Sequence, residues 1–259
     1  MDLLLQQFGE HQLVAFVLVL ARVAPLFVLA PLFSSRLVPT RVRGIVAVAL
    51  AVGLSPVLAQ GRQLPTDPID IGWLVGKEML VGLAFAFTLA ALFAAITTAG
   101  TFLDTSIGFS FGSIVDPVNG TQSSVLQQAY SLVALMVFIA INGDAWVVQG
   151  FAKTYDLVPL DRNPDLGRLV AGVDGAFVEI FSAAIQVAGP VLLALILTDA
   201  AFGLVSRVVP QLNVFGVGFP AKVTVGLLLI GASLPFVAGW LSDGLEQSVT
   251  DALRMLHVA

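Results

Sequence analysis

The sequence predicts an all-α, polytopic integral membrane protein with about six hydrophobic helices and a re-entrant plug loop. Hydrophobic residues make up 58% of the 259 positions, charged residues only 11%, and the mean hydropathy is +0.96. A water-soluble domain usually carries about a quarter charged residues. The apolar residues also form long blocks, which is typical of helices that face lipid. We therefore expect a single membrane-embedded domain over residues 1–259.

Six segments are apolar over the roughly 20 residues that a bilayer-spanning helix needs. The first contains Arg22 and Pro25, and the third contains Gly72 and Gly76, a small-xxx-small pair suited to close helix packing. A closed barrel would show short alternating strands instead. The predicted spans are residues 13–32, 44–58, 71–96, 125–141, 177–198 and 223–241.

The connecting segments differ in character. Residues 34–43 hold three arginines, residues 60–70 predict an aqueous loop, and residues 143–174 predict an amphipathic stretch at a membrane interface. The tail, residues 242–259, is polar. If all six spans cross simply, and Lys77 at the start of the third span is counted with the loop before it, the two sides of the membrane carry five and six Lys or Arg, with Arg22 inside the first span. This near-tie leaves the orientation open and indicates that some segments do not cross simply.

Composition excludes several classes of function. The net charge of −5 and the absence of a Lys or Arg run argue against a nucleic-acid partner. Cysteine is absent, and the only histidines, His11 and His257, lie at opposite ends of the chain, so no metal site, cofactor site or catalytic dyad is expected. Walker and dinucleotide motifs are also missing, and an enzyme is not predicted. The first eleven residues lack Lys and Arg, so no cleaved signal peptide is expected.

Charged side chains inside an apolar span are costly, and each needs a partner or water. Arg22 and Asp199 are the two expected to be buried, although a position near a helix end favours an interfacial anchor for Asp199. Lys77 and Glu78 lie near a helix entrance, and we expect them only to extend toward the interface.

Residues 100–122, GTFLDTSIGFSFGSIVDPVNGTQ, combine four glycines and a proline with bulky apolar residues. Such a run specifies a continuous helix poorly. Non-helical backbone at membrane depth survives only where protein or a water-filled cavity covers it. The run is either a re-entrant loop that lines or blocks a pathway, or an exposed connection, and its apolar residues favour a plug at residues 105–117. The candidate plug residues are Ile107, Gly108, Phe109, Phe111, Gly112, Ile114, Val115, Asp116 and Pro117.

A second polar run, SRVVPQLNVFGVGFPAK at residues 206–222, separates the last two hydrophobic segments. Its polar side chains could hydrogen-bond a neighbouring chain, or they could cap a short connection. From the chemistry of the residues alone, capping is the favoured interpretation.

With these runs in view, the chain resembles the FliR family of flagellar type III export-gate proteins, whose injectisome counterpart is SctT. The resemblance is carried by FLDTSIGFSFGSIVDPVNGTQ, by SRVVPQLNVFGVGFPAKV and by the opening RVAPLFVLAPLFSSRLVPTRVR, in the family's order and spacing. One position departs from the family pattern: Asp144 follows Asn142 and Gly143, where members often have His. The residues of the second run that match the family, and that we expect at subunit contacts, are Pro210, Gln211, Asn213, Phe215, Pro220 and Lys222.

The resemblance implies a location and partners. Members lie in the bacterial inner membrane at the flagellar basal body and assemble with FliP and FliQ into a pore for unfolded export substrates. Contact with FlhB and with membrane lipid is also implied. Within such a pore, Ile107, Phe109 and Phe111 would close a constriction by packing and dewetting, while Gly108 and Gly112 would let the loop move aside. The alternatives are an injectisome export-gate subunit, a secondary transporter and, least favoured, a membrane enzyme.

Overall fold

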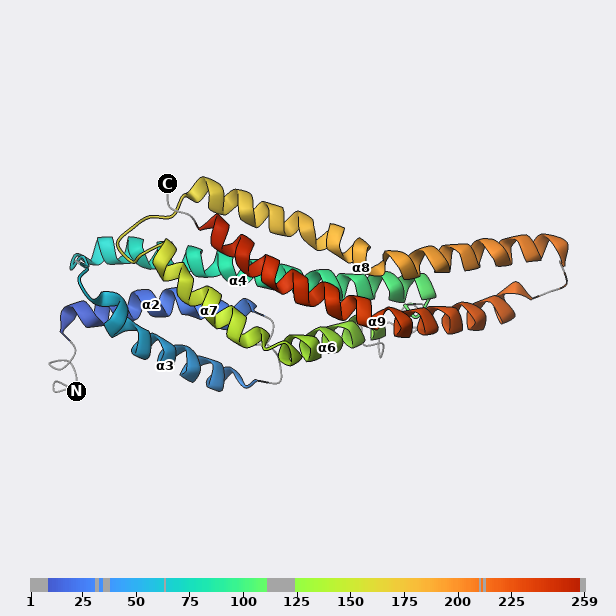
Figure 1. Cartoon of the computed structure of the whole chain (residues 1–259), viewed down its shortest axis with the longest axis horizontal. Coiled ribbons are helices and arrows are strands. Elements are labelled where there is room, and N and C mark those ends of the chain that lie inside the picture. Colours follow the sequence, from blue (N-terminus) through green and yellow to red (C-terminus); the bar gives the residue numbers. More distant parts are fainter. Residues whose placement is uncertain are drawn as a thin grey trace. The chain divides into compact units, whose positions relative to one another are not determined.

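The computed structural model describes residues 9–30, 33–34, 38–62, 64–110, 124–209, 211 and 213–256, and these ranges contain helices and no strand. The all-α prediction is therefore confirmed (Figure 1). The helices are α2 (Glu10–Leu29), α3 (Thr40–Ala59), α4 (Pro68–Ile107), α6 (Val125–Ala140), α7 (Gly143–Leu157), α8 (Leu166–Val208) and α9 (Val214–Met255).

Five of these helices are long and apolar enough to cross a membrane: α2, α3, α4, α8 and α9. A sixth candidate is the pair α6 and α7, which bend by 73° at a short break and could form one broken span or a re-entrant element. Asn142 lies at this break with φ of 54°, in the left-handed region that few side chains adopt. The prediction of a polytopic membrane protein with about six hydrophobic helices is thus confirmed.

Three helices are much longer than predicted. Helices α4, α8 and α9 contain 40, 43 and 42 residues, whereas the sequence predicted spans of about 20. At 1.5 Å per residue each helix path is about 60 Å, twice the roughly 30 Å of a hydrocarbon core. The end of the interfacial stretch 143–174 belongs to α8, and most of the polar tail 242–259 belongs to α9.

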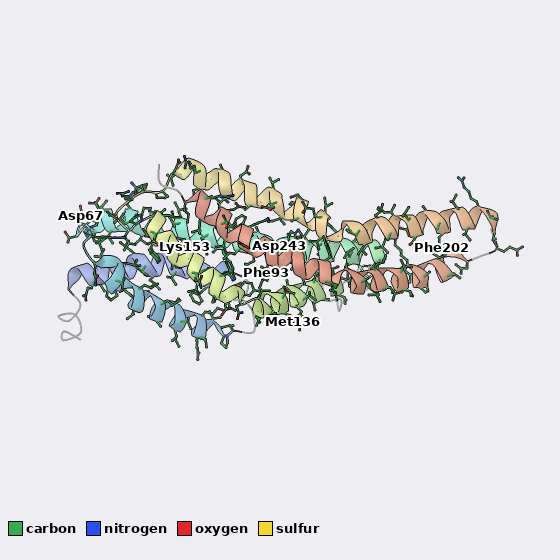
Figure 2. All side chains as sticks on the ribbon, viewed as in Figure 1. Asp67, Phe93, Met136, Lys153, Phe202 and Asp243 are labelled. Atoms are coloured by element: carbon green, nitrogen blue, oxygen red, sulfur yellow. The ribbon has the colours of Figure 1, made fainter. Side chains whose placement is uncertain are left out.

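Polar residues define where two of these helices start. Asp67 precedes Pro68 at the start of α4 and accepts a hydrogen bond from the backbone N–H of Ile69 (Figure 2). The Oδ1 atom of Asp165 accepts from the N–H groups of Gly167 and Arg168 at 2.9 and 3.2 Å. These are helix N-caps, each of which satisfies backbone donors that have no partner within the helix.

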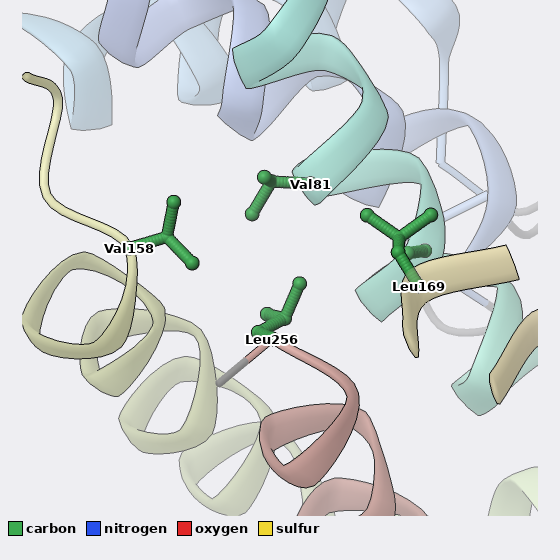
Figure 3. Packing of buried hydrophobic residues seen from close by; sticks show 5 residues of the cluster. Val81, Val158, Leu169 and Leu256 are labelled. Atoms are coloured by element: carbon green, nitrogen blue, oxygen red, sulfur yellow. The ribbon is translucent and has the colours of Figure 1, made fainter. Parts of the chain in front are cut away.

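The chain forms two compact units, and the first contains Met1–Ala91, Asn142–Phe177 and Leu245–Ala259. Within it, α2 and α3 pack against each other. A small core brings together residues from α4, from the segment after α7, and from the start of α8 and the end of the chain (Figure 3). The buried members of this core are Val81, Ala84, Val158, Leu169 and Leu256.

The second unit contains Leu92–Ile141 and Val178–Gly244, and so includes the C-terminal part of α4, all of α6 and long stretches of α8 and α9. Phe93 of α4 and Phe138 of α6 meet edge to face with ring centroids 5.6 Å apart. Other large side chains stay on the surface; Met136, labelled in Figure 2, is 67% exposed. Exposed apolar side chains on spanning helices are what lipid or other subunits would cover.

Two glycines, Gly82 and Gly100, permit close helix contacts. They are not Gly72 and Gly76, the pair that the sequence suggested. A Cβ atom at Gly82 would lie 2.1 Å from the carbonyl oxygen of Arg22, and one at Gly100 would lie 2.8 Å from Cα of Gln127. By contrast, a Cβ atom at Gly72 or Gly76 would meet nothing within 4 Å among the described residues. Among the residues that the structure describes, Gly72 and Gly76 therefore make no close helix contact.

Gly82→Ala should destabilise the protein strongly, because the added methyl group overlaps the backbone of α2. Overpacking against a side chain costs about 1–3 kcal/mol, and a backbone neighbour has less freedom to move. Gly72→Ala is the matched control, since its methyl group enters open space and removes the roughly 0.5–1 kcal/mol penalty of a helical glycine. Survival of monodisperse protein after heating in detergent, measured by size-exclusion chromatography, compares the two; equal survival would contradict the close α2–α4 contact.

Candidate functional site

The predicted plug begins where α4 ends. Ile107 is the last helical residue, and Gly108 follows with φ of +103°, a conformation that favours glycine. The N–H groups of Gly108 and Phe109 both donate to the carbonyl oxygen of Asp104, at 3.0 and 3.1 Å. This is the hydrogen-bond pattern of a glycine-terminated helix. Residues 105–107, which were predicted to begin the loop, are therefore helical, because the glycine that ends the helix is at position 108.

Ile107 is anchored rather than free. Its side chain is 1% exposed, and a Cβ atom at Gly226 would lie 2.6 Å from its Cδ1 atom and 3.4 Å from Cδ2 of Leu195. The Ile107 side chain thus occupies the space that the missing side chain of Gly226 leaves on α9, next to Leu195 of α8. Phe109 is half-buried. The other candidate plug residues, Phe111, Gly112, Ile114, Val115, Asp116 and Pro117, lie outside the described residues.

A pocket of about 630 Å³ lies beside this helix end, within the second unit. Its lining combines the end of α4 with Phe202 of α8 and Phe219 of α9, together with an ion pair. That pair joins Lys222 Nζ and Asp199 Oδ2 at 2.6 Å, with the Asp199 side chain 56% exposed. The prediction that Asp199 is buried is therefore wrong; it stands at the surface of the helix pair and holds the partly covered Lys222.

The predicted subunit-contact residues fall into three groups. Asn213 is the N-cap of α9, because its Oδ1 atom accepts from the N–H of Gly216 at 3.0 Å, and the capping interpretation is confirmed for this residue. Gln211 and Pro220 are exposed, and Lys222 forms the ion pair with Asp199. Pro210 lies outside the described residues, and Phe215 is placed only by its position in α9. Their role at subunit contacts remains a prediction.

Sequence reasoning missed Asp104, which lies inside the predicted motif. Its side chain is 2% exposed, and its Oδ1 atom accepts a hydrogen bond of 3.2 Å from the N–H of Leu126, in the first turn of α6. Ser124 caps the same helix by accepting from the N–H of Gln127 at 3.1 Å. The Asp104 carboxyl group therefore joins the end of α4 to the start of α6. Its only signal in the sequence was an acidic residue in an otherwise apolar stretch.

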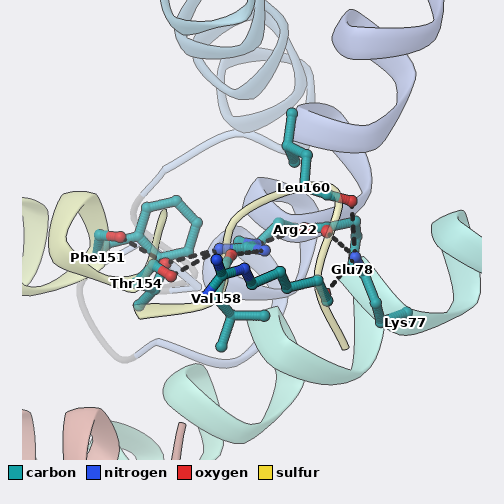
Figure 4. Close-up of polar contacts among 8 residues, drawn as sticks. Arg22, Lys77, Glu78, Phe151, Thr154, Val158 and Leu160 are labelled. Atoms are coloured by element: carbon teal, nitrogen blue, oxygen red, sulfur yellow. Dashed lines mark hydrogen bonds and ion pairs between the residues drawn. The ribbon is translucent and has the colours of Figure 1, made fainter. Parts of the chain in front are cut away.

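The most buried charges lie in the first unit, around Arg22 (Figure 4). The guanidinium Nε atom donates to Glu78 Oε2 at 2.5 Å, and both side chains are fully buried. Nη1 donates to the carbonyl oxygen of Thr154 at 3.0 Å, and Nη2 to that of Val158 at 2.7 Å. The guanidinium also lies over the ring of Tyr155, 4.2 Å from its centroid. Burial of Arg22 is thus confirmed, with Glu78 as its partner.

Lys77 completes this network. Its ammonium donates to the carbonyl oxygens of Leu160 and Arg162, both at 2.8 Å, and lies 3.1 Å from Glu78 Oε1. The ammonium is therefore hydrogen-bonded to two carbonyl oxygens and ion-paired with one carboxylate. The expectation that Lys77 and Glu78 only extend toward the interface is wrong, because the chain after α7 folds back over them.

The network is suited to holding the chain rather than to chemistry. Its two cations bind four carbonyl oxygens between residues 154 and 162. Those of Val158, Leu160 and Arg162 lie where the backbone leaves α7, while that of Thr154 also accepts from Val158 N–H at 2.9 Å in the last turn of the helix. Cations that are buried and held in this way by carbonyl and carboxylate oxygens fix the backbone that supplies those oxygens. Among the described residues, no cluster of three or more His, Cys, Asp or Glu could hold a metal ion.

Comparison with known proteins identifies relatives across nearly the whole chain. The protein family described as bacterial export proteins, family 1, matches residues 13–248 of this chain. The flagellar biosynthetic protein FliR of Escherichia coli (strain K12) is 32% identical over 219 residues, covering 85% of this chain and 84% of the relative. FliR of Bacillus subtilis (strain 168) is 34% identical, with coverage of 83% and 84%. The surface presentation of antigens protein SpaR of Shigella sonnei is 27% identical, with coverage of 81% and 80%.

Glu78→Gln should destabilise the first unit severely, because it leaves the two buried cations Arg22 and Lys77 without a counter-charge. Removing one partner of a buried pair costs about 3–5 kcal/mol. The control is Asp251→Asn, which breaks the exposed pair between Arg254 and Asp251 and should cost no more than about 1 kcal/mol. Thermal survival in detergent measures both variants.

Lys77→Met refines this test. It removes one cation and leaves Arg22 paired with Glu78, so its loss of thermal survival should be smaller than that of Glu78→Gln. The opposite order would contradict the assignment of Glu78 as the shared counter-charge.

Proposed function

The chain belongs to the family of bacterial export proteins, family 1, and from this membership we propose that it is a subunit of the flagellar type III protein export gate. The observation that carries the proposal is the family match over residues 13–248, together with similarity to FliR proteins across more than four-fifths of the chain. The helices long enough to cross a membrane fit a subunit of a membrane pore. The family is one of export proteins, and we propose no catalytic activity.

In the proposed mechanism, the segment at residues 105–117 closes the pore. Ile107 and Phe109 stand at its base, and both carry large apolar side chains beside a glycine that ends the helix. A ring of apolar side chains closes a narrow channel by excluding water, so that neither ions nor unfolded chains pass. Passage then requires only that the segment moves aside, and no chemical step is involved.

The proposed partners are FliP and FliQ in the pore, FlhB beside it, and the surrounding lipid of the bacterial inner membrane at the flagellar basal body. Exposed apolar side chains on α8 and α9 support contact with other subunits or lipid; Leu193, Leu204, Leu228 and Phe236 are each more than half exposed. Pro220 is exposed on α9, and Gln211 is exposed in the connection between α8 and α9. Unfolded export substrates would contact the chain only in transit.

An injectisome role is the second candidate. The similarity to SpaR of Shigella sonnei favours it, because that relative also matches over four-fifths of both chains. Identity to the FliR proteins of Escherichia coli and Bacillus subtilis is higher, at 32% and 34% against 27%, and supports the flagellar assignment.

Purification in mild detergent tests the assignment to an export gate. When the chain is expressed with FliP and FliQ and carries the only affinity tag, both partners should elute with it in one monodisperse complex. A stand-alone transporter would elute by itself or as a small homo-oligomer. Recovery of the tagged chain without FliP and FliQ would overturn the proposal.

Replacing Phe109 and Phe111 with Gly should raise ion conductance through the assembled complex, because the rings that exclude water are lost. Trp73→Ala serves as the control, since it removes an exposed ring near the start of α4, 36 residues before Phe109. Single-channel recording in planar bilayers makes the measurement. Unchanged conductance in an assembled Phe109→Gly, Phe111→Gly complex would count against the plug.

A further inference from the structure

The pocket beside the end of α4 has two kinds of wall. Its volume of about 630 Å³ is typical of a small-molecule site. Phe202 and Phe219 supply aromatic rings, while Asp199 and Lys222 supply one charge of each sign. We propose that this pocket binds a phospholipid whose headgroup carries both a phosphate and a primary ammonium, namely phosphatidylethanolamine. The inference requires that the chain lies in a membrane, and it does not depend on a role in export.

The charge pattern of α8 and α9 puts the pocket at the edge of the hydrocarbon core. Residues 180–198 of α8 and 223–242 of α9 contain no charged side chain. At 1.5 Å per residue these two blocks are roughly 28–30 Å long, which is the thickness of a hydrocarbon core. Asp199 follows the first block and Lys222 precedes the second, and their side chains meet at 2.6 Å. Charges that end two apolar blocks at the same level lie at the depth of lipid headgroups.

The ion pair suits a headgroup that carries charges of both signs. The Asp199 side chain is 56% exposed and that of Lys222 is 19% exposed. The pair joins Nζ to Oδ2, and an ammonium has three donors while a carboxylate has a second oxygen, so each group can take a further partner. Asp199 repels an anionic headgroup, and Lys222 repels a cationic one. A zwitterion instead places its phosphate on Lys222 and its ammonium on Asp199.

A primary ammonium fits this site better than a quaternary one. Its N–H groups can donate charge-assisted hydrogen bonds to the Asp199 carboxylate, whereas the methyl groups of choline cannot. Ser106, at the end of α4, also lines the pocket and brings a hydroxyl group that can donate to a phosphate oxygen. The polar groups of the pocket therefore distinguish ethanolamine from choline as well as from an uncharged alcohol.

The apolar wall can accommodate the start of an acyl chain. Phe202, labelled on α8 in Figure 2, is half-buried, and Phe219 of α9 is 45% exposed. Gly203 lies next to Phe202, and a Cβ atom there would meet nothing within 4 Å among the described residues. Two rings beside open space and next to a charged end match a phospholipid, in which an apolar chain adjoins a charged headgroup.

Lipid selectivity of the unaltered full chain tests the proposal. The chain is purified in mild detergent, alone and with FliP and FliQ, and is mixed with equal amounts of phosphatidylethanolamine, phosphatidylcholine and phosphatidylglycerol that have the same acyl chains. Native mass spectrometry measures which lipid stays bound. We expect phosphatidylethanolamine to bind at least about ten-fold more tightly than either competitor, because choline loses hydrogen bonds to a charged group and glycerol lacks the cation.

Two results of this measurement would overturn the proposal. Equal retention of the three lipids would indicate adsorption to the apolar helices without a headgroup site. Retention of phosphatidylethanolamine by the chain alone, but not by its complex with FliP and FliQ, would show that another subunit occupies the pocket.

Asp199→Asn assigns the selectivity to this pocket. The variant removes the charge that binds the ammonium and leaves Lys222 unopposed, so phosphatidylethanolamine should bind about ten-fold more weakly while phosphatidylglycerol binds more tightly than before. Asp251→Asn is the control, because it breaks another ion pair of α9, in which Asp251 is 52% exposed, and it should leave all three affinities unchanged. An Asp199→Asn chain that keeps its preference for phosphatidylethanolamine would overturn the assignment, and the series with the unaltered chain decides the proposal even if this variant fails to fold.

Discussion

The first unit is arranged around a cation that the apolar surroundings cannot solvate. Arg22 lies in the middle of α2, and its nearest acid is supplied by α4, 56 residues further along the chain. Glu78 neutralises one of two buried cations, and the second, Lys77, is satisfied by carbonyl groups. Those carbonyls belong to the segment after α7, which has no helical partners of its own. One requirement, that no buried charge or carbonyl stays unpaired, therefore determines how α2, α4 and the end of α7 meet.

The second unit is held by different means. Its described buried residues are mostly apolar, and its helices approach through gaps that glycines leave, at Gly100 facing α6 and at Gly226 facing Ile107. Asp104 is the buried acid here, and it is matched to a helix start rather than to a cation. A cap of this kind joins two helices without a pair of opposite charges. The exposed ion pair between Asp199 and Lys222 adds little to stability, because solvent screens it.

The helical, membrane-embedded character could be predicted because it depends on composition and on the length of apolar blocks. Helix ends could not, because hydropathy identifies the apolar centre of a helix while Asp67, Asp165 and Asn213 start helices from polar sequence. Burial of Arg22 was predictable from its place in a span, but its pairing with Glu78 depends on which helices adjoin. Likewise the motif around residues 100–122 was recognisable, whereas the roles of Gly100 and Asp104 emerge only once α6 is placed beside α4.

The end of α4 is fixed by contacts with three other helices. Ile107, its last residue, is buried against Gly226 of α9 and Leu195 of α8, and the carboxyl group of Asp104 accepts a hydrogen bond from the first turn of α6. Gly108 then ends the helix: its φ of +103° is open to glycine, and its N–H group and that of Phe109 both donate to the carbonyl oxygen of Asp104. Because a side chain at position 108 would be strained in this conformation, the glycine that stops α4 also determines the direction in which the chain leaves it.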